Sequence, residues 1–553
     1  KHAVALAEVV DRVPDPTEHG HAWYRLQLKA SRGFPGLHVG GSYLLHERFT
    51  DWTSPKLLDE LRALDEEPAP CSLARLVTDP GRYRGTPPDV DVLHAPGLAL
   101  GKQHGMTSSQ LAAFDGVLRH TLQLVWGPPG TGKTWFLAMT VLSMLEASRQ
   151  AGRPCRVVVT AFTHAAIDNL LRRIRKLQKE RAVLQEKLAI GKCVRSEDPG
   201  AGIQAVPKNE AFPWLCTNER AVLGATVWRL LGTVPPGDAS LTDLVVVDEA
   251  SQVKVAEAAL AVRRIRTGGR LVLAGDHRQL PPIVQGTYPD PEPGEPLLHR
   301  SIFEAVRAAD PEGACSATLL ENFRMCKELC RFPAETLYHP DYRPANDDIA
   351  NQRLAFDATK TDDPFVARAL DPSNPLVVVI IDGVRATAEN VFEAELAGRL
   401  GLALREQAGL PDGDDGDRRF WSDHLFVVTP HHVQRRAVVR ALQGGRDWQV
   451  PPFVDTVDKM QGQECAAVIV SYGVSDLELA LREKEFIYSL ERLNVAITRA
   501  QKKCVVFLPR PLLEPDLEAF ADDDVAEGIA FMQRLPAAAD DVIVVNPSIT
   551  GAG

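Results

Sequence analysis

Residues 127–134 could cradle the phosphates of a nucleotide. They read GPPGTGKT, follow the apolar run Leu122–Trp126 and open a helix at Trp135, which is the context that a P-loop requires. Backbone N–H groups and the helix N-terminus would face phosphate oxygens. Lys133 would reach the β- and γ-phosphates, and the Thr134 hydroxyl would ligate Mg²⁺. The alternative is a glycine turn without a ligand, which this strand-and-helix context disfavours.

Two carboxylates are expected beside this loop. Leu244–Val247 is an apolar run that ends in Asp248 and Glu249. This places both acids at the carboxyl edge of a buried strand, where ligands bind in open α/β sheets. Asp248 could hold Mg²⁺, and Glu249 could accept a proton from an attacking water. Gln279 follows the next apolar run and could sense the γ-phosphate, although an ordinary turn would give the same spacing.

The rest of the chain must supply the elements that position these groups. Short apolar runs alternate with helical stretches, and such runs are typical of buried parallel strands. We therefore predict an α/β fold with two tandem parallel-sheet domains. A less regular insert is expected at about 172–220; it opens with the basic residues 172–177, which we interpret as a solvated helix face. The strand candidates are Leu122–Trp126, Arg156–Thr160, Leu244–Val247, Arg270–Leu273, Leu376–Ile381, Leu425–Thr429, Ala466–Ser471 and Cys504–Leu508.

The first hundred residues have a different pattern. Turn residues separate three predicted strands, and a helical stretch follows at Pro55–Leu64. The three strands are Val4–Val13, Ala22–Ala30 and Gly41–Arg48. We therefore predict four regions: a β-rich accessory module with a helical arm at 1–100, a first domain at 101–305, a second at 306–545 and a tail at 546–553. Because the chain begins with Lys1 and not Met, we expect further sequence upstream.

Composition excludes several classes of protein. The chain has 553 residues, 45% hydrophobic and 24% charged, which is typical of globular domains and not of disordered or fibrous chains. A net charge of −11 argues against a uniformly basic nucleic-acid coat, but not against a local basic groove. No apolar run approaches the ~18 residues of a membrane span, so no membrane partner is expected. Nine cysteines without a CxxC pair argue against a zinc or redox motif and fit a reducing cytoplasm.

Taken in order, the motifs of the chain resemble those of superfamily 1 helicases over residues 101–510. The similarity is greatest to the 5′-to-3′ branch that contains the nonsense-mediated-decay RNA helicase and the Okazaki-fragment nuclease-helicase. The wording of four motifs, DEASQ, GDHRQLPP, TVDKMQG and RLNVAITRA, favours the DNA-acting nuclease-helicase side. The matching segments are 109–111 (SQL), 127–134, 160–169 (TAFTHAAIDN), 224–226 (GAT), 248–252, 275–282, 321–325 (ENFRM), 429–432 (TPHH), 456–464 and 492–500.

The resemblance implies two RecA-like domains that face each other across a cleft with ATP and Mg²⁺. Gln110 would read the adenine, and Phe323 would stack on it in place of the tyrosine usual in the family. Arg324 and Arg499 would be arginine fingers on the transferring phosphoryl group, with a surface salt bridge as the alternative for each. Glu464 would be a further nucleotide contact. The nucleotide would be held by Gln110, Gly127, Pro128, Pro129, Gly130, Thr131, Gly132, Lys133, Thr134, Phe323 and Glu464. Catalysis would use Lys133, Glu249, Gln279, Arg324 and Arg499, and Mg²⁺ would use Thr134 and Asp248.

The resemblance also implies contacts to a polymer. Thr163 and Thr226 would hold the backbone of a single strand on the first domain, and Thr429, Pro430 and Thr456 would hold it on the second. Hydroxyl and N–H contacts to phosphates carry no sequence information, which suits a motor that moves over any sequence. The alternative for these threonines is a cap of a helix or turn.

The expected function is that of an ATP-dependent helicase or translocase on single-stranded nucleic acid, DNA in preference to RNA. The 5′-to-3′ direction comes from the resemblance alone. The alternatives are an RNA helicase of the same family, a P-loop ATPase that remodels proteins, and a scaffold without catalysis. Neither a nuclease carboxylate cluster nor the iron–sulfur cysteines of some nuclease-helicases are evident in the sequence. Any nuclease domain or subunit would therefore have to lie upstream of Lys1. Abundant Arg, Ala and Pro suggest a GC-rich, bacterial genome, and we expect a cytoplasmic role in DNA repair or replication.

Overall fold

A computed structural model describes most of the chain, and its contacts divide it into two units, Lys1–Pro55 and Lys56–Gly553. In the first unit, β1 (Leu6–Pro14) pairs with β2 (Ala22–Lys29) in antiparallel fashion, which confirms two of the predicted strands. The third predicted strand, 41–48, lies outside the described residues, so a β-rich module is not shown. The described residues are 6–14, 22–29, 54–66, 72–184, 188–194, 199–235, 240–284, 295–387, 389–460 and 462–547.

The helices that follow residue 55 belong with the first sheet, not with the strands before them. Glu60 of the first helix lies 2.6 Å from the Arg263 guanidinium and 3.0 Å from that of Arg264. Asp89 pairs with Arg270 at 2.6 Å, and both side chains are buried. The domain boundary expected at residue 100 therefore falls near residue 55. The elements concerned are α1 (Ser54–Glu66), α2 (Leu73–Thr78), η1 (Pro80–Arg84) and α3 (Val90–Gln103).

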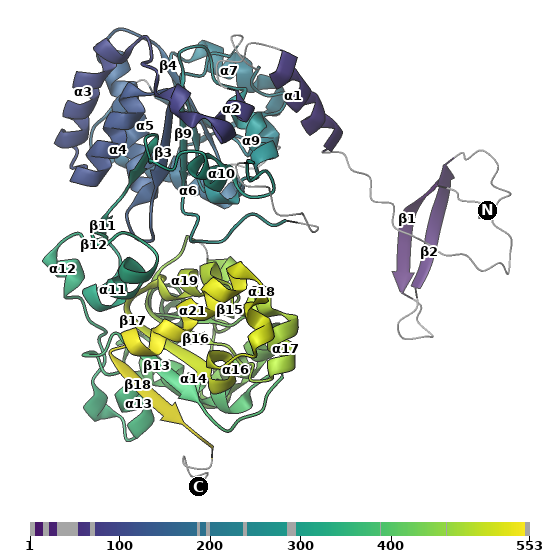
Figure 1. Ribbon diagram of the computed structural model, residues 1–553, viewed down its shortest axis with the longest axis vertical. Coiled ribbons are helices and arrows are strands. Elements are labelled where there is room, and N and C mark those ends of the chain that lie inside the picture. Colours follow the sequence, from purple (N-terminus) through teal and green to yellow (C-terminus); the bar gives the residue numbers. More distant parts are fainter. Residues whose placement is uncertain are drawn as a thin grey trace. The chain divides into compact units, whose positions relative to one another are not determined.

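The first domain is built on a parallel sheet (Figure 1). Alternate residues of its strands face opposite cores: Leu244 and Val246 pack into one, Val245 and Val247 into the other. Helices cover both faces, which is why the strands read as continuous apolar runs. The strand order in the described residues is β10 (Ser316–Thr318), β3 (Leu122–Trp126), β9 (Arg270–Gly275), β8 (Leu244–Val247), β4 (Cys155–Thr160), β7 (Arg220–Gly224), β5 (Ala189–Cys193) and β6 (Gln204–Val206). The helices are α4 (Ser108–Arg119), α5 (Lys133–Gln150), α6 (His164–Glu180), α7 (Ala211–Thr217), α8 (Val227–Leu230), α9 (Val255–Val262) and α10 (Ile302–Ala308).

Two sequence-based boundaries in this domain differ from the structure. The segment 172–220, expected as an irregular insert, completes α6 and supplies β5, β6 and α7, so it extends the sheet. Its basic stretch is one face of α6, because Ile174 and Leu177 are buried while Arg172 and Arg173 are exposed. The second domain, expected from residue 306, begins later, since β10 pairs with β3 of the first sheet.

The second domain repeats the architecture with a second parallel sheet. Its strands also alternate between two cores: Val378 and Ile380 face one, Val377 and Val379 the other. A short parallel pair, β11 (Glu321–Asn322) and β12 (Arg343–Pro344), lies in the chain between the two sheets. The strand order in the described residues is β15 (Val454–Asp455), β14 (Leu425–Val428), β16 (Cys465–Ser471), β17 (Ala500–Pro509), β13 (Leu376–Ile381) and β18 (Asp541–Val545). The helices are α11 (Lys327–Thr336), α12 (Asp347–Ala350), α13 (Pro364–Ala369), α14 (Val391–Gln407), α15 (Asp414–Arg419), α16 (His432–Gly445), α17 (Leu477–Arg482), α18 (Lys484–Ile487), α19 (Leu490–Ile497), α20 (Arg510–Leu513) and α21 (Asp523–Ala538).

All eight strand candidates within these sheets are strands in the structure. The fold is therefore α/β with two parallel sheets, consistent with tandem RecA-like domains. Across the described ranges, no helix combines the length and apolar character needed to span a bilayer.

Glu393 makes the stability of the second domain sensitive to pH. Its side chain is fully buried in the first turn of α14, and its Oε1 accepts hydrogen bonds from Ser471 Oγ at 2.8 Å and Gly473 N at 3.0 Å. Burial raises the pKa of Glu393 to about 8, and these hydrogen bonds only partly oppose the shift. The protonated carboxyl is thus favoured in the folded protein.

We expect Glu393→Gln to flatten the dependence of stability on pH. A pKa raised on folding stabilises the protein below the unfolded value near 4.5, and this stabilisation is lost as pH rises towards 8. Relative to the variant, the wild type should lose roughly 1–3 kcal/mol of unfolding free energy between pH 5 and 8. Urea denaturation at several pH values measures this, with the exposed Glu395→Gln as control. Parallel curves for wild type and Glu393→Gln would contradict the prediction.

Candidate active site

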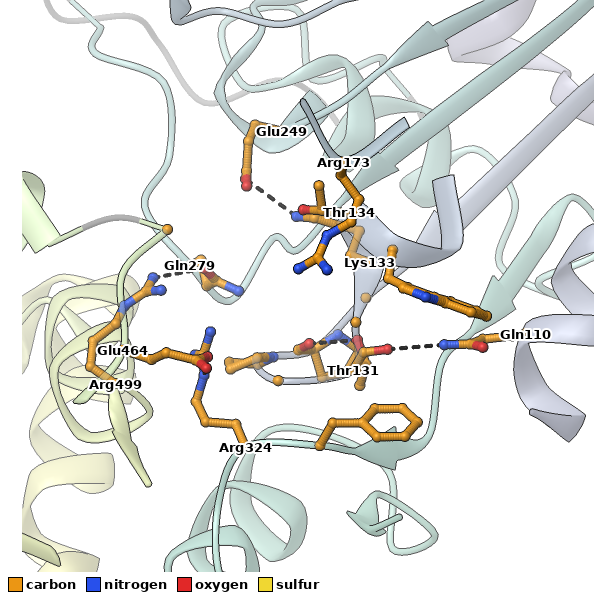
Figure 2. Close-up of a pocket in the computed structure, with 18 of the residues that line it drawn as sticks. Gln110, Thr131, Lys133, Thr134, Arg173, Glu249, Gln279, Arg324, Glu464 and Arg499 are labelled. Carbon is orange, nitrogen blue, oxygen red and sulfur yellow. Dashed lines mark hydrogen bonds and ion pairs between the residues drawn. The ribbon is translucent and has the colours of Figure 1, made fainter. Parts of the chain in front are cut away.

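A cavity of about 600 Å³ brings together most of the residues predicted to hold a nucleotide (Figure 2). The first domain contributes the P-loop segment 127–134 and side chains from α4, the end of β8 and the loop after β9. The chain after residue 320 contributes the opposite wall. Both walls are needed to close the cavity, so the site exists only where the two domains meet. The predicted residues that line it are Gln110, Gly127, Pro128, Pro129, Gly130, Thr131, Gly132, Lys133, Thr134, Glu249, Gln279, Phe323, Arg324, Glu464 and Arg499.

The P-loop joins the end of β3 to the start of α5 and is in contact with the opposite wall. Gly130 has a positive φ of 75°, and a Cβ on it would lie 2.8 Å from Cβ of Arg324, so only glycine fits. Its carbonyl oxygen accepts a hydrogen bond of 2.8 Å from Phe323 N. The amide of Asn322 donates to Pro129 O at 3.0 Å. The first turn of α5 begins at Lys133, so its partial positive charge faces the cavity.

Gln110 is held by backbone groups on both sides of its amide. Its Oε1 accepts from Thr107 N at 3.2 Å in a capping box at the start of α4, and its Nε2 donates to Thr131 O at 3.3 Å. The side chain is buried, with 1% exposure. The predicted adenine-reading glutamine thus fixes the P-loop relative to α4 in this structure.

The two predicted carboxylates lie at the carboxyl end of β8, beside the P-loop lysine. Glu249 Oε2 is 3.3 Å from Lys133 Nζ, and Glu249 has a φ of 51°, a left-handed conformation unusual for a non-glycine residue. Burial alone would lower the pKa of Lys133, but Glu249, Asp248 and Asp276 outweigh it and raise that pKa above its usual range. Burial raises the pKa of Asp248 to about 6, against the opposing charge of Lys133.

The oxygen donors at this point fit a hard divalent cation. Asp248 supplies a buried carboxylate and Thr134 a hydroxyl next to the P-loop lysine. Magnesium is usually bound by one or two carboxylates together with substrate phosphates and waters. Within the described residues, no group of three or more His, Cys, Asp or Glu side chains could hold a metal.

Two arginines reach the cavity from the second domain. Arg324 Nε lies 2.6 Å from Glu464 Oε2, and its Nη1 donates to Thr498 O at 2.9 Å. Arg499 donates to Gln279 Oε1 at 3.4 Å and to Gln463 O at 3.2 Å. Burial, reinforced by the charge of Arg324, lowers the pKa of Arg499 to about 9. With 3% exposure, Arg499 does not fit the surface salt-bridge alternative, whereas Arg324 does form an ion pair, which faces the cavity.

Arg173 also lines the cavity, although its role was not predicted from the sequence. It lies on the exposed face of α6, and its guanidinium points towards the P-loop side of the cavity (Figure 2). Sequence periodicity only showed that this face of α6 is polar. One available signal was that α6 follows β4 and so begins at the same edge of the sheet as the P-loop, where one face of the helix can line the cavity.

The residues predicted to contact a polymer form two pairs, each at the carboxyl ends of two neighbouring strands. Thr163 and Thr226 follow β4 and β7, which are neighbours in the first sheet. Thr429 and Thr456 follow β14 and β15, which are neighbours in the second. The Thr163 hydroxyl accepts from Ala166 N at 3.2 Å and so caps α6, whereas Thr226 occupies a cap position without such a bond.

The pair on the second domain lines a small, mainly apolar hollow. Thr429, Pro430 and Thr456 all contribute to its wall. The Thr429 Oγ1 is buried and has no hydrogen-bond partner within the described residues. The structure thus places the predicted residues together on each domain without assigning them a ligand.

Comparison with known proteins shows what each half of the chain resembles. Residues 105–290 match a family model described as an AAA domain, and residues 298–508 match a second model with the same description. The human DNA replication ATP-dependent helicase/nuclease is 26% identical over 446 residues, 75% of this chain and 38% of the human protein. Both halves of the chain thus resemble the superfamily 1 ATP-dependent helicases. The chain is also similar to the Saccharomyces cerevisiae DNA replication helicase/nuclease, with 24% identity over 76% of this chain and 27% of that protein.

An archaeal relative and a solved structure were also found to be similar to this chain. An uncharacterized ATP-dependent helicase of Methanocaldococcus jannaschii is 26% identical over 280 residues, 50% of this chain and 37% of that protein. The chain thus spans well under half the length of these curated relatives. Among solved structures, Mss116p bound to ssRNA and AMP-PNP matches with 12% identity over 83% of this chain and 79% of that one, at a TM-score of 0.37. A likeness of that degree supports no conclusion about ligand or fold.

Proposed function

We propose that this protein is a helicase that hydrolyses ATP with Mg²⁺ to move along single-stranded DNA in the 5′-to-3′ direction and to unwind duplexes. The observation that supports this most is the shared cavity. One wall carries a P-loop, Lys133 and Glu249, and the other carries Arg324 and Arg499. A P-loop whose arginines come from a second domain can hydrolyse ATP only when the two domains are together, which converts hydrolysis into domain movement.

Each side chain has a distinct role in the proposed reaction. Lys133 and the start of α5 hold the phosphates, and Glu249 accepts the proton of the attacking water. Gln279 orients that water, and Arg499 with Arg324 stabilises charge on the transferring phosphoryl group. A magnesium ion held by Asp248 and Thr134 would neutralise the phosphate oxygens. The nucleoside would lie towards Phe323 and Glu464, where a phenyl face is available for stacking.

Movement along the polymer would follow from the two threonine pairs. Thr163 and Thr226 follow strands of the first sheet, and Thr429 and Thr456 follow strands of the second. A change in the distance between the domains would therefore change the distance between the two pairs of polymer contacts. Contacts from hydroxyl groups to phosphates are independent of sequence. The relatives named as DNA replication helicase/nucleases favour DNA over RNA and support a role in DNA replication.

The decisive experiment compares ATP hydrolysis without polymer, with single-stranded DNA and with single-stranded RNA, followed by unwinding of 5′- and 3′-tailed duplexes. Stimulation by DNA and unwinding from a 5′ tail are expected. Stronger stimulation by RNA would favour the RNA-helicase alternative, and ATP hydrolysis indifferent to both polymers would favour a remodelling ATPase.

Binding of single-stranded DNA should weaken steeply with salt despite the net charge of −11. Each neutralised phosphate contributes about −0.7 to the slope of log affinity against log salt, so contact with several phosphates predicts a slope of roughly −2 to −5. Fluorescence anisotropy at increasing salt measures it. Thr456→Ala, which removes a neutral hydroxyl, should weaken the coupling of ATP hydrolysis to DNA but leave the slope nearly unchanged. Affinity independent of salt would contradict a phosphate-contacting motor.

A further inference from the structure

A buried carboxylate beside the cavity collects hydrogen bonds from both domains. Asp276 follows β9 and is fully buried. Its Oδ1 accepts from Trp126 Nε1 at 2.9 Å and from Arg278 N at 3.1 Å. Its Oδ2 accepts from Gln279 Nε2 at 2.7 Å and from Tyr338 OH at 2.9 Å. Three of these donors belong to the first domain, and Tyr338 belongs to the second.

This carboxylate determines which way the amide of Gln279 faces. An ionised carboxylate only accepts hydrogen bonds, so the group of Gln279 that faces Asp276 must be the NH₂. The Oε1 is thereby turned towards Arg499, whose Nη2 lies 3.4 Å away, and towards the cavity. An acceptor oxygen in this position is what orientation of an attacking water requires.

Tyr338 brings the second domain into this arrangement. It lies just beyond the end of α11, and its ring packs against the hydrophobic core of the second domain. Its hydroxyl accepts a hydrogen bond of 2.7 Å from Asn494 Nδ2 on α19, and Asn494 also donates to Arg278 O at 2.7 Å. The same helix leads to Arg499. The hydroxyl therefore joins α19, the helix that ends two residues before Arg499, to the carboxylate that orients Gln279.

We infer that Tyr338 is a positioning residue that couples the approach of the two domains to the orientation of Gln279 through Asp276. The hydroxyl reaches Asp276 only when the domains lie together, so Gln279 is held for reaction only in that state. Separation of the domains removes one of the two hydrogen bonds on Oδ2 and leaves the amide of Gln279 as the only described donor to that oxygen. The inference rests on the proposed function, because it assigns a task within the same ATPase cycle.

Tyr338→Phe tests the hydroxyl alone. We expect kcat for ATP hydrolysis to fall about tenfold, in line with loss of a hydrogen bond to a charged group, while KM for ATP stays within about twofold. The matched control is Tyr488→Phe, because Tyr488 is also a buried tyrosine of the second domain and its hydroxyl has no partner within the described residues. Its kcat should equal that of the wild type.

A double-mutant cycle separates positioning from general support of the fold. If Tyr338 acts through Gln279, Tyr338→Phe should cost nothing further in a Gln279→Ala background, because the group it positions is gone. Effects that multiply, an unchanged kcat in Tyr338→Phe, or an equal loss in Tyr488→Phe would overturn the inference. If Tyr338→Phe does not fold, as judged by its melting temperature, Asn494→Ala takes its place in the same cycle. Wild-type protein that fails to hydrolyse ATP would overturn the proposed function itself.

Discussion

Lys133→Ala should reduce ATP hydrolysis to the background of the assay, a loss of more than roughly 10³-fold. The ammonium lies at the start of α5, 3.3 Å from Glu249, where it would meet the β- and γ-phosphates. Three carboxylates raise its pKa above the usual range, so it carries its charge throughout the physiological range. Steady-state release of phosphate, with and without single-stranded DNA, measures the loss.

The fold should survive this substitution, because the side chain pairs with acids of the cavity and is not part of the hydrophobic cores. A melting temperature within a few degrees of the wild type is expected. Lys176→Ala provides the control, since Lys176 is an exposed lysine of α6 that pairs only loosely with Glu180, at 3.7 Å. Near-normal turnover in Lys133→Ala would refute the assignment of the nucleotide site.

Arg499→Ala should lower kcat by roughly 10³-fold, with only a modest change in affinity for ATP. The guanidinium approaches from the second domain, is almost fully buried and touches Gln279 at 3.4 Å. Because charge builds up on the phosphoryl group chiefly in the transition state, a cation placed there acts on the rate more than on binding. Single-turnover hydrolysis combined with equilibrium binding of a nucleotide analogue separates the two effects.

Arg482→Ala is the matched control for Arg499→Ala, since Arg482 is an exposed arginine of the second domain that pairs with Glu478 on its own helix. A loss below about fivefold in Arg499→Ala would show that Arg499 has a structural role only. Arg499→Lys should recover little, because a lysine cannot present two donors in a fixed plane.

The sequence by itself determined the parts of the site that are local in the chain. Gly127 to Thr134 could be recognised because a phosphate-binding turn is made by consecutive residues between a strand and a helix. Asp248 and Glu249 could be placed at a sheet edge because the apolar run before them ends there. Eight strands of the two sheets could also be predicted, because strands that are covered on both faces must be apolar along their whole length.

Boundaries between domains were less accessible, because they depend on what each helix packs against. Helices α1 to α3 have ordinary amphipathic patterns, and only the pairs Glu60–Arg263 and Asp89–Arg270 assign them to the first sheet. Strand β10 joins the first sheet through backbone hydrogen bonds with β3. Because backbone pairing does not depend on particular side chains, the sequence did not reveal to which sheet β10 belongs.

Only the tertiary structure decided which distant residues act together. In the sequence, Arg173 is only a polar position on one face of a helix. The structure shows that this face of α6 lines the cavity beside the P-loop. Tyr338 and Asp276 are separated by more than sixty positions in the chain and lie on different domains, yet their oxygens are 2.9 Å apart. Sequence patterns record the burial and the local geometry of one element at a time. A contact between domains depends on how two folded surfaces meet, and a single buried hydroxyl has no periodicity that would reveal its partner.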